Sequence, residues 1–185
     1  MTADTLRADT IRIAALDRAG LERALDSLAE ILHACVHDGA SVGFVLPFTR
    51  EAARAFWRET VAPGVAAGTR ILLVAEHGGE VAGTVQLGLG TMPNQRHRAE
   101  IAKLLVHPRH RRRGIGRALM LEAEQAARCH GRALITLDTK TGDAAEPLYL
   151  ALGYELAGRI PGYARDTREP GRFDATSVMY KTLRD

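Results

Sequence analysis

The feature that most constrains this chain is a short, basic, glycine-containing loop between a predicted strand and a predicted helix. The strand covers Glu100–Val106, the loop ends as Arg111-Arg112-Arg113-Gly114-Ile115-Gly116, and the helix extends to about Cys129. A helix start leaves backbone N–H groups unpaired and carries a partial positive charge, so it binds anions. Glycines let a phosphate approach the backbone, and arginines add charge-assisted hydrogen bonds. The junction therefore predicts a site for a polyanion such as a pyrophosphate.

Two standard nucleotide motifs do not fit this loop. A dinucleotide-binding G-x-G-x-x-G pattern needs glycine or alanine where the chain has Leu119, and no Gly-Lys-Ser/Thr follows to make a P-loop. The basic run Arg109–Arg113 also allows a solvated loop or a nucleic-acid patch. A nucleic-acid surface needs further basic or aromatic residues to extend it, and none can be mapped from the sequence. The pattern favours a phosphorylated cofactor, with a nucleic-acid-binding domain as the alternative.

Hydrophobic periodicity predicts an α/β chain with a mixed central sheet. Apolar residues three and four apart predict a helix from about Arg18 to His37, and Thr49 caps a second helix that ends near Pro63-Gly64. The later predicted elements are strands at 70–76, 80–89 and 100–106, a helix at 114–129, a strand at 133–138, a short helix ending at 152, and strands at 154–159 and 174–183. The strand–helix–strand crossover implies one parallel pair. We expect about six to seven strands, helices on both faces and a loop over 161–172.

Length and composition predict one domain. With 185 residues, of which 46% are hydrophobic, the chain fits a single domain over 1–185 with a core at 11–183. The first residues hold no apolar stretch typical of a signal peptide, and no apolar run approaches the roughly 18 residues that span a bilayer. Cys35 and Cys129 match no zinc spacing. We therefore expect a cytoplasmic protein with no membrane segment and no bound metal, and we leave open whether it forms a homodimer.

Two motifs carry a resemblance to a known family. The string Val106-His107-Pro108-(x)2-Arg111-(x)2-Gly114-x-Gly116 resembles the acetyl-CoA-binding motif of the GNAT N-acetyltransferase superfamily, and Leu148-Tyr149-(x)3-Gly153-Tyr154 resembles its second signature. Many members carry an asparagine seven residues before the tyrosine, where this chain has Gly142. The segments 40–47 and 145–149 also look similar to tabtoxin-resistance-type acetyltransferases, which acetylate the amine of a small toxin.

The resemblance implies an acetyl-CoA-dependent N-acetyltransferase domain that acts on the amine of a small molecule by direct transfer in a ternary complex. It assigns acetyl-CoA, as co-substrate, to Leu104, Leu105, Val106, Arg111, Arg112, Arg113, Gly114, Ile115, Gly116 and Arg117. It also implies that backbone N–H groups of Leu104–Val106 stabilise the reacting oxygen, and that the neighbouring strand Ile135–Asp138 splays away to admit the pantetheine arm. A non-catalytic acyl-CoA sensor is a further alternative.

The resemblance also suggests two catalytic residues. Tyr149 matches the family's proton donor to the departing thiolate, a role that suits a phenol with a pKa near 10, although an aromatic residue on a short helix is also typical of a core. Glu100 lies fourteen residues before Gly114, where histone-type members carry a catalytic base. A solvated carboxylate at a strand edge, with a water chain as the base, is the alternative for Glu100.

Other polar residues are weaker candidates. The family fold usually contacts its acceptor just after the first helix, so His37, Asp38 and Ser41 are candidates for acceptor contact, with ordinary surface polar residues as the alternative. Tyr163, in the loop over 161–172, is a candidate of the same standing. Three more polar residues, Lys103, His107 and Asp138, are expected to be paired polar groups at strand ends.

Overall fold

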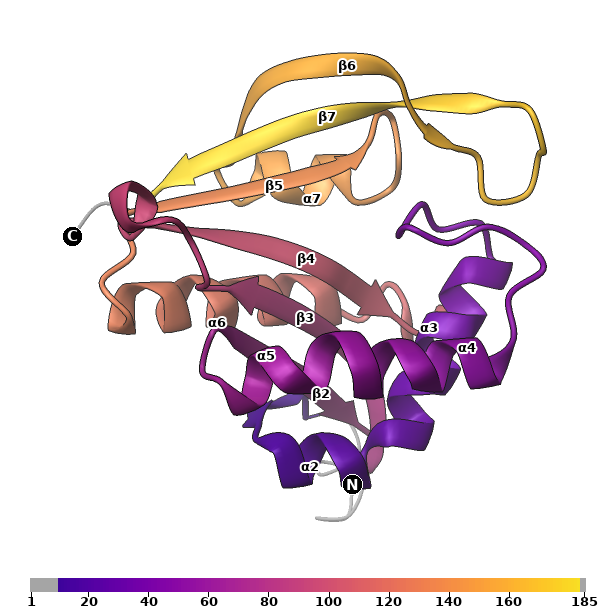
Figure 1. Cartoon of the computed structure of the whole chain (residues 1–185), viewed down its shortest axis with the longest axis horizontal. Coiled ribbons are helices and arrows are strands. Elements are labelled where there is room, and N and C mark those ends of the chain that lie inside the picture. The colour runs from indigo at the N-terminus through magenta and orange to yellow at the C-terminus, as the bar shows by residue number, and fades with distance from the viewer. Residues whose placement is uncertain (1–9, 184–185) are drawn as a thin grey trace, which may run out of the picture.

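Seven strands form one mixed sheet in the order β1-β2-β3-β4-β5-β7-β6 (Figure 1). The computed structural model describes residues 10–183. The strands are β1 (Arg12–Leu16), β2 (Arg70–His77), β3 (Glu80–Gly88), β4 (Arg98–Val106), β5 (Leu134–Lys140), β6 (Glu155–Arg165) and β7 (Phe173–Thr182). Neighbouring strands are antiparallel except β4 and β5, which are parallel. The α/β fold class and the parallel pair predicted from the sequence are confirmed.

Helices cover both faces of the sheet (Figure 1). They are α2 (Arg18–Arg23), α3 (Leu25–His37), α4 (Arg50–Ala55), α5 (Ala62–Ala66), α6 (Ile115–Cys129) and α7 (Glu146–Ala151), with a π-helical segment, Phe56–Val61, between α4 and α5. One buried cluster joins the sheet to α6 and α7, and the other joins the opposite face to α3, α4 and the π-helical segment. Within residues 10–183, no helix is long and apolar enough to cross a membrane.

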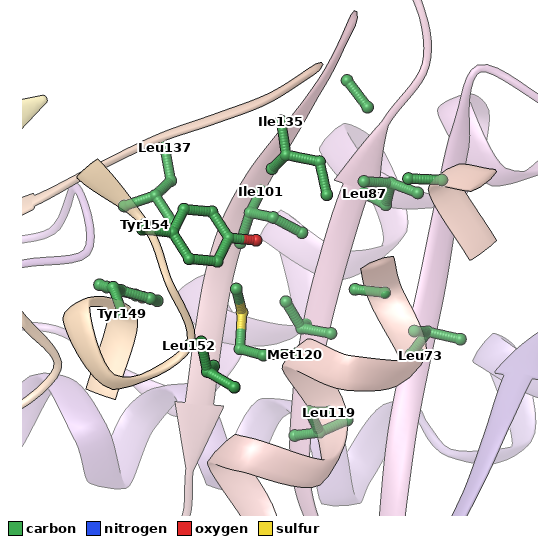
Figure 2. Packing of buried hydrophobic residues seen from close by; sticks show 14 of the residues in the cluster. Leu73, Leu87, Ile101, Leu119, Met120, Ile135, Leu137, Tyr149, Leu152 and Tyr154 are labelled. Carbon is green, nitrogen blue, oxygen red and sulfur yellow. The ribbon is translucent and has the colours of Figure 1, made fainter. Parts of the chain in front are cut away.

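The cluster on the α6 side sets how closely that helix approaches the sheet. Met120 and Leu119 of α6 pack against side chains of several strands, and Tyr154 closes the cluster at the α7 end (Figure 2). A Cβ at Gly83 would lie 2.8 Å from the Leu105 carbonyl oxygen and 3.1 Å from Ile115 Cγ2. Glycine at this position therefore lets α6 begin directly against β3 and β4.

The sequence predictions were wrong at several element boundaries. The first helix is broken at Ala24, and the second does not end at Pro63-Gly64 but continues to Ala66. The strand β1 was not predicted at all. The predicted loop over 161–172 is strand in its first part, because β6 continues to Arg165, and the rest of it is the connection to β7. β6 is exposed along almost its whole length, so it lacks the alternation of buried and exposed residues by which a strand is predicted.

The parallel pair β4 and β5 is joined over a short distance only. Its register covers three pairs, from Arg98 opposite Leu134 to Glu100 opposite Thr136. Beyond Glu100 the two strands diverge, and β5 continues beside β7 (Figure 1). The register of β4 against β3 also shifts, between Thr84 and Gln86 of β3. The splaying expected for Ile135–Asp138 is present only from Leu137 onward, because Ile135 and Thr136 are still paired with Ala99 and Glu100.

Candidate active site

A cavity of about 420 Å³ opens where β4 and β5 diverge. Its walls come from segments far apart in the sequence: the end of α3 and the following loop, the second half of β4, the end of β5, α7 and the loop before it, and parts of β6 and β7. The predicted cofactor residues that line it are Leu104, Leu105, Val106 and Arg111. Residues of both predicted motifs, Val106 and Arg111 from the first and Tyr149 from the second, therefore line the same cavity.

The remaining predicted cofactor residues lie just past the end of β4, at the start of α6. Gly114 is the N-cap residue, with φ of 81°, and no side chain caps the helix. Arg112 also has a positive φ, of 62°. In the part of the chain that the structure describes, no hydrogen bond engages the backbone N–H groups of residues 112–117. These donors are therefore available to an anion.

Gly116 serves a different purpose from the one its position in the loop suggests. A Cβ there would lie 3.3 Å from Leu148 Cδ2 and 3.8 Å from Val106 Cγ2. Ile115 points into the core, where it is 1% exposed. The glycine thus allows α6 to pack closely against α7, and Gly114 is the glycine that the loop conformation itself requires.

Two of the predicted residues, Arg111 and Asp38, form an ion pair with each other. Arg111 Nε also donates to the Val106 carbonyl oxygen, at 3.4 Å. On the other side, Arg168 donates to the His37 carbonyl oxygen at 2.7 Å. Asp38 thereby connects the end of α3 to the predicted phosphate loop, a contact that no sequence pattern indicated.

The candidates for acceptor contact separate into two groups. Ser41 and Tyr163 line the cavity, as does Asp38. His37 is not among its lining residues: its Nδ1 lies 3.0 Å from the His33 carbonyl oxygen, and the two imidazole rings stack with centroids 4.0 Å apart. The expectation that His37 contacts the acceptor is therefore not supported by its place in the structure.

Tyr149, in α7, belongs to the core and also lines the cavity. It is 5% exposed and packs edge to face with Tyr154, with ring centroids 5.9 Å apart. Burial, together with the nearby carboxylates of Asp143 and Asp138, raises the pKa of Tyr149 well above its usual value. The phenol therefore stays protonated at neutral pH, and the two sequence interpretations, core aromatic and proton donor, are compatible.

Glu100 does not line the cavity that contains Tyr149. It is exposed and lines a neighbouring cavity of about 480 Å³, with residues of β2 and β3. Ala102 lines both cavities, so they adjoin at this residue of β4. Asp138 of β5 is exposed and lines the same cavity as Tyr149. Two carboxylates therefore border the site from different sides.

Lys103 was predicted to be a paired polar group, and this is wrong. It lies where the register of β4 shifts against β3, has a φ of 51°, and lines the cavity. Over residues 10–183, no hydrogen bond or ion pair engages its ammonium group. The other two residues predicted in the same way do have contacts: Arg109 N donates to His107 Nδ1 at 3.2 Å, and Thr176 Oγ1 donates to Asp138 Oδ2 at 3.4 Å.

The position where many family members carry asparagine is supported by a residue that the sequence analysis missed. The Gly142 backbone N–H donates to Glu146 Oε2 at 2.6 Å. Oε1 of the same carboxylate accepts from Arg159 at 3.2 Å and from Ser177 at 3.1 Å. The backbone hydrogen bond, with these partners, lowers the pKa of Glu146 below its ordinary value. Glu146 therefore holds the loop that precedes α7.

Comparison with known proteins decides the family. A model described as the acetyltransferase (GNAT) family matches residues 25–154. This chain belongs to the GNAT acetyltransferase family. The matched segment contains both motifs, the β4–β5 divergence and the start of α6, so the family's hallmark elements coincide with the cavity.

Individual relatives are distant. An uncharacterized N-acetyltransferase encoded in the hisH–hisA intergenic region of Azospirillum brasilense is 30% identical over 126 residues, which cover 66% of this chain and 72% of that protein. N-acetyltransferase 8B of Rattus norvegicus is 36% identical over 88 residues, 46% of this chain and 40% of the rat protein. The chain thus matches less than half the length of the rat protein.

Solved structures show the same GNAT fold. The structure of yncA from Salmonella typhimurium, determined with its cofactor acetyl-CoA, has a TM-score of 0.76 to this chain, with 21% identity and 95% of each chain covered. At this level of identity the likeness establishes the fold, and the assignment of individual residues depends on the geometry of this chain.

Proposed function

We propose that this chain is an acetyl-CoA-dependent N-acetyltransferase that acetylates the amine of a small molecule by direct transfer in a ternary complex. The observation that carries the proposal is the meeting of three features at one place: the diverging strands β4 and β5, the uncapped start of α6, and Tyr149. Each feature suits one part of an acetyl-CoA molecule and its reaction.

The residues fit acetyl-CoA by charge and by hydrogen bonding. The free N–H groups at residues 112–117, with the side chains of Arg112, Arg113 and Arg117, suit a pyrophosphate. The edge of β4 beyond Glu100, which β5 leaves open, suits the amide groups of a pantetheine arm because a strand edge offers both donors and acceptors. No metal is assigned a part in this proposal.

The reaction needs a base, a stabilised oxyanion and an acid. An acceptor ammonium must lose its proton because only the neutral amine attacks. We assign that proton to Glu100 through water, with Asp138 as the competing carboxylate. Backbone N–H groups of Leu104–Val106 would stabilise the negative oxygen that forms when the amine attacks the thioester carbon. Tyr149 would then protonate the departing thiolate.

Two joined segments, the loop after α3 and the turn between β6 and β7, form a roof over the cavity. This roof favours a small acceptor over a protein chain. The loop after α3 reaches the turn between β6 and β7 (Figure 1). Leu46 N donates to the Thr167 carbonyl oxygen at 3.0 Å, and Thr167 Oγ1 donates to the Ala40 carbonyl oxygen at 3.0 Å. Two segments that could otherwise stand apart are thus joined across the cavity, which limits the room for a polypeptide.

The test is a screen for CoA release. The purified protein is mixed with acetyl-CoA and each member of an amine library, the free thiol is detected colorimetrically, and acetylated products are verified by mass spectrometry. We expect release that depends on a subset of small amines. Binding of acetyl-CoA without turnover of any amine would instead indicate an acyl-CoA sensor. Salt-sensitive binding of DNA or RNA, without acetyl-CoA binding, would indicate the nucleic-acid alternative.

A further inference from the structure

We propose that the acceptor carries an anionic group beside its amine, as an amino acid does, and that Lys103 binds this anion. This inference rests on the proposed acetyltransferase function and specifies its substrate class. Three features of Lys103 support this role: its place in β4, the surroundings of its ammonium group, and its difference from the other lysines of the chain.

The backbone of β4 turns Lys103 out of the regular strand pattern. Its neighbours Ala102 and Leu105 pair with Gln86 and Thr84 of β3, so two residues of β4 occupy the space opposite one residue of β3. Lys103 has a φ of 51°, in the left-handed region that residues with side chains rarely adopt. Such conformations cluster at functional sites, where the surrounding structure holds them in place.

The ammonium group lies on the acceptor side of the cavity. It is 5.9 Å from the centroid of the Phe56 ring, and a Cβ at Gly43 would lie 3.8 Å from its Nζ. Phe56 belongs to the π-helical segment and Gly43 to the loop of the roof, both on the face opposite α6. Lys103 therefore faces the roofed space, and the start of α6 lies at the other end of the site.

The chain has three lysines, and Lys103 differs from the other two. Lys140 Nζ lies 3.0 Å from Asp166 Oδ2 and also pairs with Asp174. Lys181 Nζ lies 2.7 Å from Glu124 Oε2. All three are half-buried, yet within residues 10–183 only Lys103 lacks a carboxylate partner. A half-buried cation that faces an aromatic ring and has no carboxylate partner is costly, and an anionic ligand would compensate it.

The charged groups around Lys103 suit an acceptor that carries both a positive and a negative charge. Asp138, across the divergence on β5, lines the same cavity, and Glu100 and Arg70 border the neighbouring one. Burial lowers the pKa of Lys103, while Asp138 and Glu100 act in the opposite direction. A zwitterion with its carboxylate at Lys103 would direct its ammonium group toward these carboxylates, which is where the proton must leave.

The experiment compares acceptors that differ only in the anionic group. The pairs are leucine with isoamylamine, tyrosine with tyramine, and histidine with histamine, together with the carboxamide of every amino acid that the amine screen finds active. For the wild-type protein we expect kcat/KM at least about 10-fold higher for the carboxylated member. Lys103→Met should remove this preference by raising KM for the carboxylated member about 10- to 100-fold, with kcat changed much less.

Three controls distinguish anion binding by Lys103 from a structural role or a general effect of charge. Lys103→Arg keeps the charge and should retain part of the preference. Arg58→Met removes an exposed cation that does not line the cavity and should leave both members unchanged. The thermal shift caused by acetyl-CoA should be the same in Lys103→Met as in wild type, which shows that the variant folds and binds its co-substrate.

Two results would overturn the inference while leaving the proposed function intact. One is a wild-type enzyme that releases CoA with amines but does not prefer the carboxylated member of any pair. The other is an equal loss for both members in Lys103→Met, which would make Lys103 a base or a structural residue. If no amine supports CoA release by the wild-type protein, the proposed function itself fails, and this inference fails with it.

Discussion

The two ends of the site are built in different ways. The cofactor end consists of one continuous segment, from the second half of β4 through the loop to α6, and it offers mainly backbone N–H groups and exposed arginines. The acceptor end is assembled from the loop after α3, the end of β5 and the β6–β7 turn, with contacts between residues as far apart in sequence as Thr167 and Ala40. The first end therefore depends on one local stretch of sequence, and the second depends on contacts between segments that are distant in the sequence.

The largest expected effect is at the cofactor end, in Gly114→Glu. The new carboxylate would lie where the pyrophosphate is proposed to bind, and the φ of 81° adds strain. We expect the loss of the stabilisation by acetyl-CoA, which is about 2.7 kcal/mol at one hundred times its dissociation constant. Thermal melting with and without acetyl-CoA measures it.

Gly131→Glu is the matched control for this variant. Gly131 follows the other end of α6, also has a positive φ, of 66°, and has open space around its Cβ position. It should keep the full thermal shift. A folded Gly114→Glu protein that keeps the full shift would contradict the assignment of the loop.

The next effect is expected where the two ends meet, in Tyr149→Phe. Loss of the hydroxyl should reduce kcat about 10²-fold or more, as for loss of a general acid, with acetyl-CoA binding nearly unchanged. Because the folded protein raises the pKa of Tyr149, the acid is protonated below that raised pKa and becomes ineffective only above it. The wild-type rate should therefore not fall as the pH rises from 7 to 10.

Tyr154→Phe is the control for the hydroxyl. Tyr154 is 2% exposed in the same cluster (Figure 2). It is not among the lining residues of the cavity. Its variant should keep wild-type kcat within a few-fold. Equal turnover in Tyr149→Phe and wild type at saturating substrate would leave Tyr149 with a packing role alone.

A comparison of Glu100→Gln with Asp138→Asn tests which carboxylate acts as the base at the acceptor end. An alkylamine with a pKa near 10 is almost entirely protonated at pH 7, so the variant that lacks the base should lose about 10²-fold in turnover there. The loss should shrink as the pH rises, since solvent then deprotonates the amine. We expect this profile for Glu100→Gln.

The pH–rate profiles of both variants, measured with one good acceptor, distinguish the carboxylates. A Glu100→Gln profile parallel to wild type, with an Asp138→Asn profile that converges on wild type at high pH, would transfer the role of base to Asp138. That outcome would agree with the position of Asp138 in the cavity lined by Tyr149.

The smallest effect is expected for Asp38→Asn, which removes the ion pair that connects the two ends. Both side chains are nearly half exposed, so the pair should contribute at most about 1 kcal/mol to the free energy of unfolding. Urea denaturation of both proteins measures the difference, and 1 M NaCl should reduce it. A loss of several kcal/mol would mean that the two ends depend on each other for folding.

The same contrast explains what could be predicted from the sequence. The strand, loop and helix around Gly114 were predictable because their conformation depends on residues that are close together in the sequence. The role of Lys103 was not, because it depends on a register shift between β4 and β3, and strand register is not encoded in β4 alone. Glu146 was missed because its partners lie as far away as Ser177. The sequence distance between Glu100 and Gly114 did not reveal that Glu100 would face a separate cavity.

The short ladder between β4 and β5 also has a mechanical consequence. Three residue pairs are the only strand pairing, within residues 10–183, between the sheet portion β1–β4 and the portion β5–β7–β6. Backbone ladder bonds therefore join the two portions at one end of the divergence only. Farther along, the connection depends on the shared core on the α6 side and on the Leu46–Thr167 hydrogen bond across the cavity.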